Sequence, residues 1–171
     1  GEYFKQINTH NKAYFLGFVC ADCCIYRRNG HQGMLSIGVK DSDIEILNNF
    51  KADIQTTKPI NIVKQPEKTT MATLQLTSDK LIEDLLKLGV GVRKTFDLSI
   101  KTVIDNIPKQ YIPSFILGYF DGDGSIDIPT DNTISKSHLR IAGPISSLTD
   151  FHDILKIFDI ESKIIKDKRD Y

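Results

Sequence analysis

The sequence predicts an α+β fold of two related halves, each with the order αββαββα and an antiparallel sheet, the second half being incomplete at its C-terminal end. The first observation is a repeated segment, at 15–23 and 116–124, in which an apolar run with a central glycine contains an acid near its end. The second is that helical and strand patterns return in the same order after the second copy. The acids of the two copies lie 123 minus 22, or 101, residues apart, which indicates two small halves, 1–107 and 108–171.

The first half begins with a helix and a hairpin. Residues 11–24 are expected to form a buried helix, since they are apolar on nearly every side. The pair Asn29-Gly30 is a strong turn signal and predicts a hairpin over 25–40. Within it, apolar and polar residues alternate along 34–40, as in a strand with one buried face.

A second helix, two strands and a third helix follow. Ser42 and Glu45 have the spacing of a capping box and predict a helix that begins there. Alternating residues predict strands at 60–65 and 69–77, and Ser78 is expected to cap the third helix. The first half therefore has the full αββαββα order.

The second half repeats this order after a linker over 90–112. Proline is favoured in the first turn of a helix, so Pro113 marks the start of a buried helix that ends at Asp123. The elements expected after it are strands at 125–128 and 137–143, a helix from Pro144, and the start of a strand at 162–166. No residues remain for the last strand and helix, so we expect a trimmed chain, a disordered tail or a completing partner chain.

Composition narrows the function classes. The chain has 22 basic and 22 acidic residues, so a nucleic-acid partner would require charges segregated between faces. No apolar run reaches the roughly 18 residues of a membrane span. Cys20, Cys23 and Cys24 lie too close together for a disulfide framework, which indicates an intracellular protein. They are expected to be small buried helix residues, with a metal or redox role as the alternative.

The two repeated segments carry glycines at matched positions. Gly17 and Gly118 each cost a helix about 1 kcal/mol relative to alanine, which close packing of the two helices would explain. Ala21 and Gly122, four residues further on, keep the same helix face small. We therefore expect these residues to form an interface between the two helices, at the seam between the halves.

Such packing would bring Asp22 and Asp123 together at the C-terminal ends of the two helices. Carboxylates there are disfavoured by the negative end of the helix dipole and by their mutual repulsion. A divalent cation removes both objections, and Mg²⁺ accepts one or two carboxylates together with water and phosphate oxygens. The sequence therefore predicts a metal site at the seam, with polar helix caps as the alternative.

The segments 15–23 and 116–124 resemble the paired motifs of the LAGLIDADG homing endonucleases. The second segment is the closer, reading Leu-Gly-Tyr-Phe-Asp-Gly-Asp-Gly-Ser over 117–125, and 89–98 resembles the usual link between the motifs. The αββαββα order also matches, so the resemblance covers nearly the whole chain. It implies a monomeric, pseudo-symmetric saddle whose sheets lie in the major groove of double-stranded DNA with a long, asymmetric target.

The resemblance also implies an activity: a site-specific endonuclease that hydrolyses a phosphodiester on each strand with Mg²⁺ and serves intron or intein mobility. Ca²⁺ is expected to support binding without cleavage. Carried over by position, Asp22 and Asp123 are the catalytic acids and metal ligands. Asp121 matches an earlier, mostly structural acid, whose place in the first motif is taken by Cys20. Cys23 stands where the first motif usually has glycine, and is expected to alter the helix end near Asp22.

Two lysines are candidates for contact with phosphate. Lys40 ends a strand that should run toward the metal site, and the resemblance implies that it positions the attacking water or stabilises the phosphate. The alternative for Lys40 is a solvated residue at the entry to the next helix. Lys94 matches a lysine of the link between the motifs and is expected to hold a phosphate.

Polar residues on the expected strands form the candidate DNA-binding set. Short polar and amide side chains suit base edges, and basic residues at strand ends suit phosphates. The candidates are Arg27, Arg28, His31, Ser36, Lys40, Lys64, Lys68, Thr73, Gln75, Thr77, Lys94, His138 and Arg140. A solvated sheet face would show the same alternation, so that alternative stays open.

A second function class also stays open. The same fold can serve as a DNA- or RNA-binding module without nuclease activity, in an intron-splicing maturase or a transcription regulator. The neutral net charge and Cys23 are the features that keep this alternative in view. A third alternative is a truncated element that folds only with a partner chain.

Overall fold

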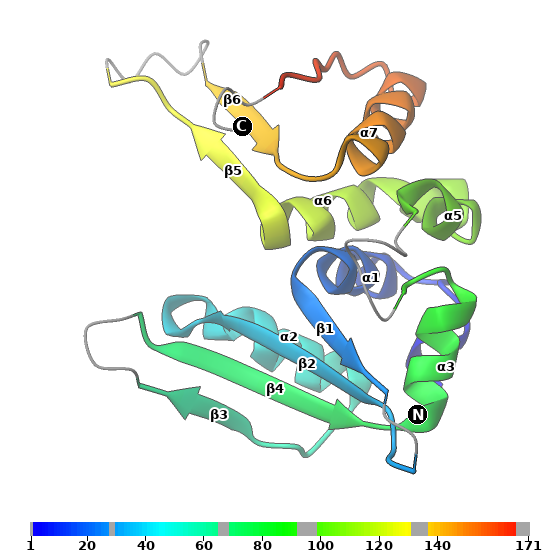
Figure 1. Ribbon diagram of the computed structural model, residues 1–171, viewed down its shortest axis with the longest axis vertical. Helices are drawn as coiled ribbons and strands as arrows, with labels where there is room; N and C mark the ends of the chain where they lie inside the picture. The colour runs from blue at the N-terminus through cyan, green and yellow to red at the C-terminus, as the bar shows by residue number, and fades with distance from the viewer. Residues whose placement is uncertain (1, 28–29, 65–68, 92–98, 131–136, 167–171) are drawn as a thin grey trace.

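The computed structural model describes residues 2–27, 30–64, 69–91, 99–130 and 137–166. Two long helices, α1 (His10–Asp22) and α6 (Ile112–Asp123), lie side by side at the centre, with one sheet below them and another above (Figure 1). Over the described residues the fold is α+β with antiparallel sheets, as the sequence predicts. None of the helices in these ranges is long and apolar enough to cross a membrane.

The first half carries the fuller set of elements. In chain order these are η1 (Tyr3–Lys5), α1, β1 (Cys23–Tyr26), β2 (Met34–Lys40), η2 (Asp41–Asp43), α2 (Ile44–Ile54), β3 (Ile60–Val63), β4 (Met71–Thr77) and α3 (Asp79–Lys87). The strands form an antiparallel sheet, the first sheet, in the order β1-β2-β4-β3. Ser78 caps α3 as predicted, because its hydroxyl oxygen accepts a hydrogen bond from the Leu81 amide.

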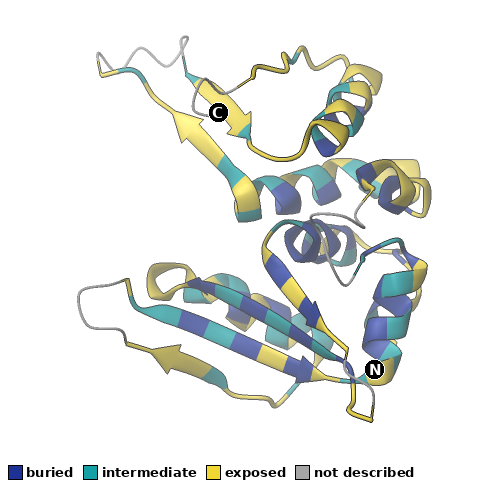
Figure 2. Cartoon of the chain, viewed as in Figure 1, coloured by how far each residue is buried: buried dark blue, intermediate teal, exposed yellow. Residues whose placement is uncertain are grey.

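The two faces of the first sheet differ. Buried residues, dark blue in Figure 2, alternate along β2 and β4; they are Leu35, Ile37, Val39, Ala72, Leu74 and Leu76. This face packs against α2 and α1. The opposite face, here called the open face, carries residues that are half-buried or exposed. The period of two that the sequence shows in these strands therefore becomes one core face and one open face.

The hydrophobic core lies between the first sheet, its helices and α6. The fully buried aromatic residues in it are Phe4, Phe18, Phe50 and Phe115. The ring centroids of Phe15 and Phe50 lie 4.7 Å apart. Helix α1 is buried on nearly every side, as its all-round apolar composition predicts.

The second half is built around α6. Its elements are α5 (Ile100–Asp105), η3 (Lys109–Tyr111), α6, β5 (Gly124–Asp127), β6 (His138–Ile141) and α7 (Ile145–Ile157). β5 and β6 pair antiparallel and form the second sheet. Ile126 pairs with Leu139 on its apolar face, where the two residues are 59% and 71% exposed. Within the described residues this half therefore covers its sheet far less than the first half does.

Two expected helix ends in the first half are wrong. The first helix ends at Asp22 rather than at residue 24, because Cys23 already has extended backbone and begins β1, in which Cys24 is exposed. The capping box expected at Ser42 does not form. β2 continues to Lys40 and the chain passes through the 3-10 turn η2, so α2 begins later, with Asp43 at its N-cap and no side-chain capping bond.

Two expectations for the later part of the chain are also wrong. The linker expected over 90–112 contains helix α5, which Ser99 caps by accepting a hydrogen bond from the Thr102 amide. Its buried residues recur at helical spacing, a pattern that the sequence already shows. The strand expected at 162–166 is absent from that described segment. A strand forms only against a hydrogen-bonding neighbour, and a short segment with two isoleucines does not supply one.

Candidate functional site

Helices α1 and α6 approach each other closely at two glycines. A Cβ added to Gly17 would lie 2.0 Å from the carbonyl oxygen of Phe115, and one added to Gly118 would lie 1.9 Å from the carbonyl oxygen of Tyr14. Tyr14 and Phe115 are equivalent in the two repeats, since 115 minus 14 is 101. The contact is therefore symmetric, and a side chain at either glycine would force the backbones apart.

The close approach continues to the C-terminal ends of both helices. A Cβ added to Gly122 would lie 2.5 Å from the Cβ of Ala21 and 3.5 Å from the Cβ of Asp22. Asp22 is the last residue of α1 and Asp123 is the last of α6, and both are exposed. The structure thus brings the two acids to neighbouring helix ends at the seam between the halves.

Both helices end in the same way despite different residues after the acids. The amide of Cys23 donates to the carbonyl of Val19, and the amide of Gly124 donates to the carbonyl of Phe120. A Cβ at Gly124 would lie 2.2 Å from the Phe120 ring and 2.4 Å from the Phe120 carbonyl oxygen, whereas Cys23 carries its side chain at the matching place in the first motif with extended backbone. Cys23 therefore fits without a glycine, and the expected alteration of the helix end is not seen.

The donor set at the seam fits a divalent cation that shares its coordination with a bound substrate. Two carboxylates at the negative ends of two helix dipoles attract positive charge. Mg²⁺ typically takes few protein carboxylates and completes its octahedron with water and phosphate oxygens. No group of three or more His, Cys, Asp or Glu that could hold a metal ion occurs in the described part of the chain. Asp22 and Asp123 therefore suit a metal that phosphate oxygens help to bind.

Five of the candidate DNA-binding residues lie together on the open face. Ser36 pairs with Gln75, Lys40 pairs with Met71, and Thr77 pairs with Met34 across β2 and β4. Thr73 pairs with Gly38 in the same register. Paired residues of antiparallel strands point to the same face, so these polar side chains form one continuous surface.

Sequence reasoning missed four further residues of the open face. The register adds Cys24 opposite Ser36, Tyr26 opposite Met34, Asn61 opposite Thr73 and Val63 opposite Met71. Tyr26 and Val63 are 47% and 44% exposed. The alternation within β1 and β3 could have indicated these residues, but only the pairing shows which parity faces outward.

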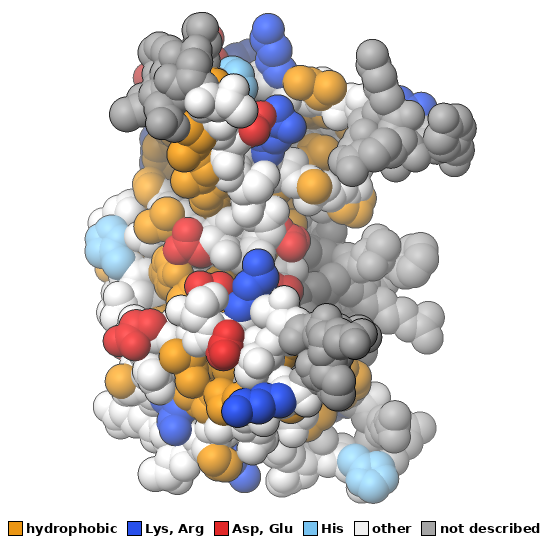
Figure 3. Space-filling model, turned by 90° about the vertical axis from the view of Figure 1, so that its left-hand side faces the viewer, with side chains coloured by type: hydrophobic (Ala, Val, Ile, Leu, Met, Phe, Trp, Pro, Cys, Tyr) orange, Lys and Arg blue, Asp and Glu red, His pale blue; other side chains and the backbone are white. Residues whose placement is uncertain are grey.

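The basic candidates lie at the ends of the strands. Arg27 follows β1, His31 lies in the turn before β2, and Lys64 follows β3, all of them exposed. Arg28, Lys68 and Lys94 lie outside the described residues. Figure 3 shows acidic and basic side chains interspersed over the side of the molecule that it displays. This mixture agrees with the formal net charge of zero.

Solved structures of homing endonucleases are similar to this chain in fold. No protein-family model matches the chain. The homing endonuclease I-WcaI, bound to its DNA recognition sequence, is 12% identical with a TM-score of 0.67, covering 98% of this chain and 76% of that one. I-DmoI in complex with DNA and Mn is 17% identical with a TM-score of 0.57, covering 92% of this chain and 82% of that one. The chain has the fold of the LAGLIDADG homing endonucleases.

A third solved structure and one curated protein are also similar to this chain. The LAGLIDADG meganuclease I-CpaMI, bound to uncleaved DNA, is 15% identical with a TM-score of 0.54, covering 91% of this chain and 76% of that one. Among curated proteins, the "Probable translation initiation factor IF-2" of Methanocaldococcus jannaschii is 24% identical over 163 residues. That match covers 92% of this chain, which spans 13% of the length of the relative.

In this LAGLIDADG fold the two motif helices are not fully equivalent. The hydroxyl of Tyr14 donates a hydrogen bond of 2.7 Å to Oδ2 of Asp121 across the helix interface. Partial burial, and then this hydrogen bond, raise the pKa of Tyr14 well above its usual range, so the phenol remains a donor. The position equivalent to Asp121 in α1 is Cys20, which is buried. Asp121 thus ties the end of α6 to α1.

Tyr119 places a second phenol near Asp123, the acid at the end of α6. Burial, followed by the negative charge of Asp123, raises the pKa of Tyr119 to about 12. Its ring packs against Phe151 at 4.5 Å between centroids, which fixes it from the side of α7. At neutral pH Tyr119 therefore keeps its proton.

The second sheet presents a polar face made by β5 and β6. His138 pairs with Asp127, and Arg140 pairs with Ser125. Nη2 of Arg140 also forms an ion pair of 2.5 Å with Oδ2 of Asp127, in which both side chains are more than half exposed. Exposed ion pairs of this kind contribute little to stability, so the pair with Asp127 does not hold Arg140 firmly in place.

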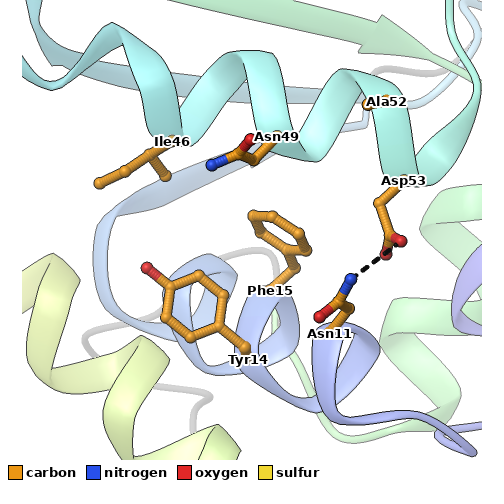
Figure 4. Close-up of a pocket in the computed structure, with 7 residues that line it drawn as sticks. All are labelled: Asn11, Tyr14, Phe15, Ile46, Asn49, Ala52 and Asp53. Atoms are coloured by element: carbon orange, nitrogen blue, oxygen red, sulfur yellow. Dashed lines mark hydrogen bonds between the residues drawn. The ribbon is translucent and has the colours of Figure 1, made fainter.

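A hollow of about 520 Å³ opens between α1 and α2, away from the two acids (Figure 4). Its polar lining includes Asn11 and Asp53, which are joined by a hydrogen bond of 3.2 Å, and Asn49. Tyr14 and Phe15 supply its aromatic wall. Neither Asp22 nor Asp123 lines it, so the hollow is separate from the candidate metal site.

Proposed function

We propose that this protein is a site-specific, metal-dependent endonuclease that hydrolyses a phosphodiester on each strand of duplex DNA. The observation that carries the proposal is the meeting of Asp22 and Asp123 at the ends of two helices packed through Gly17, Gly118 and Gly122. The fold, which is that of homing endonucleases solved with DNA, supports a DNA-binding nuclease. Cutting of uninterrupted gene copies would then serve intron or intein mobility.

The chemistry proposed for the seam requires Mg²⁺. When bound, the metal supplies a more acidic water and stabilises charge that develops on the phosphate. Asp22 and Asp123 would hold the metal at the seam between the halves, and the metal would bind the phosphate there. Lys40 lies three residues beyond Ile37, the partner of Cys23, and so about 10 Å along β2 from the start of β1. At that place the Lys40 ammonium group can stabilise a nearby DNA phosphate or position the attacking water.

The open face is proposed to read bases in the major groove. Gln75 can form paired hydrogen bonds with adenine, while Ser36, Thr73 and Thr77 accept or donate single bonds. Arg27, His31 and Lys64, at the strand ends, would contact phosphates and set the register without reading sequence. Because the polar face of the second sheet carries His138 and Arg140 instead, the target of a monomer would be asymmetric.

The deciding experiment separates binding from cleavage. Duplexes bound in Ca²⁺ are selected from a randomised library and then incubated with Mg²⁺. We expect a defined double-strand break for the wild type. Asp22→Asn and Asp123→Asn should each lower the cleavage rate by about 100-fold or more, because a metal ligand is lost, yet bind in Ca²⁺ within about threefold of wild type. Asp153→Asn, at an exposed acid of α7, is the matched control.

Other outcomes have distinct meanings. Tight binding of duplex DNA by the wild type with no cleavage in Mg²⁺ would contradict the nuclease and support a catalytically silent binding module. A preference for structured RNA over duplex DNA would point to the maturase form of that module. Affinity should also fall steeply with salt, because phosphate contacts release counterions.

A further inference from the structure

Gly38 lies inside β2 on the open face, where glycine is costly. Glycine in a strand interior is less favourable than alanine by about 0.5–1 kcal/mol and offers no side chain for packing. Gly38 pairs with Thr73 of β4, and its neighbours on the same face of β2 are Ser36 and Lys40. A glycine at this central place in the sheet therefore needs a reason.

The free protein does not provide that reason. A Cβ added to Gly38 would lie 3.8 Å from Oγ1 of Thr73 and 3.9 Å from Cε of Met71, which is ordinary van der Waals contact. Its φ lies outside the left-handed region, unlike that of Gly30 or Gly89. By contrast, a Cβ at Gly33 would lie 2.7 Å from Ile82. Neither packing nor backbone conformation requires glycine at position 38.

The register places Gly38 beside the candidate metal site. β1 begins at Cys23, which pairs with Ile37, so Gly38 is the first residue of β2 beyond the start of β1, on the side of α1. Asp22 ends α1 at that point. A side chain at position 38 would therefore rise from the open face at the part of β2 nearest the end of α1, although no atom of Asp22 lies within 4 Å of an added Cβ. Strand glycines with no internal cause often mark the close approach of a ligand.

We propose that Gly38 keeps open the path by which the phosphodiester backbone of duplex DNA reaches Asp22. This inference rests on the proposed function, because it names the residue that lets substrate approach the same acids. The DNA backbone passes over position 38 on the side of Lys40, and the absent side chain leaves room for a phosphate and its sugar. A methyl group at position 38 should leave the protein folded but weaken its binding to DNA.

The test uses Gly38→Ala and Gly38→Val in the full chain, with thermal unfolding, binding in Ca²⁺ and cleavage in Mg²⁺ measured on the selected duplex. Both variants should unfold at or above the wild-type temperature, since strands favour side chains and β-branched ones most. Gly38→Val should bind at least about tenfold more weakly and cut correspondingly slower, with Gly38→Ala in between. Gly143→Ala, at a glycine with nothing within 4 Å, is the control for adding a methyl group outside the first sheet.

The outcomes separate the two proposals. Variants of Gly38 that fold, bind and cut within twofold of wild type overturn this inference while leaving the nuclease intact. A wild type that neither binds nor cuts duplex DNA overturns both. Should Gly38→Val unfold early, Gly38→Ala decides the matter, because its added methyl group makes only ordinary contacts.

Discussion

The two halves of the molecule match at the seam and diverge in their sheets. At the seam, Gly17 and Gly118 each meet a carbonyl oxygen at nearly the same distance, 2.0 and 1.9 Å from an added Cβ. In the first sheet Leu74 is fully buried, whereas Leu139 in the second sheet is 71% exposed. The two halves are therefore closely symmetric where the backbones of α1 and α6 touch. They differ in their sheets, where the requirement is only that apolar side chains be buried.

The helix contact that positions the two acids and the sheets around it are therefore stabilised in different ways. The contact of α1 with α6 positions Asp22 and Asp123. It depends on glycines that no larger residue can replace without moving a helix backbone. The sheets depend on apolar area, which the first half buries and the second leaves exposed within the described residues. Short antiparallel ribbons are marginal without a covered face, so the halves should differ in local stability.

The largest expected effect comes from breaking the symmetric contact. Gly118→Val should destabilise the protein by about 4 kcal/mol or more, since its side chain collides with the backbone at Tyr14 and neither helix can yield without moving the core. Denaturant unfolding followed by circular dichroism measures the loss.

The matched control is Gly143→Val, at a glycine whose added Cβ meets nothing within 4 Å. It should change the free energy of unfolding by less than about 0.5 kcal/mol, as exposed substitutions usually do. Equal stability of the Gly118 and Gly143 variants would contradict the tight helix contact.

A smaller effect should distinguish the two sheets. Leu74→Ala should cost about 3 kcal/mol, since it opens a cavity in a fully buried place. Leu139→Ala, the same change at a side chain that is 71% exposed, should cost less than about 0.5 kcal/mol. Both are measured by urea unfolding. A comparable loss in the two variants would show that the apolar face of the second sheet is covered in solution.

The smallest expected effect concerns pH and the difference between Tyr119 and its equivalent in α1, Phe18. The folded-state pKa of Tyr119 is raised from 10.0 to about 12. Its contribution to stability is therefore fully present below about pH 10 and is lost as the pH rises toward 12, because the unfolded chain releases the proton first.

Tyr119→Phe makes the two helices alike and removes this contribution. The difference in unfolding free energy between wild type and variant should shrink or change sign between pH 10 and about 12, and stay constant below pH 9. Urea unfolding at a series of pH values provides the measurement. Parallel curves over the whole range would mean that Tyr119 is not buried beside Asp123.

Much of the fold can be predicted from the sequence, because caps and strand patterns depend on residues that are close together in the chain. The cap at Ser78 and the alternation in β2 and β4 are local patterns, and the structure contains them as predicted. Helix α5 lies within the linker expected over 90–112, although Ser99 and the spacing of its apolar residues already indicate a helix there. The capping box at Ser42 failed since η2 displaces the start of α2.

For the candidate site, the residue pattern alone identified the repeat, its glycines and the acids Asp22 and Asp123, because a period and a motif can be seen in one dimension. Only the folded chain decided which strand parity faces outward, added Tyr26, Asn61 and Val63 to the open face, and set Gly38 beside the end of α1. Those facts follow from strand register and helix contact. Both are long-range pairings, which local patterns constrain but do not specify.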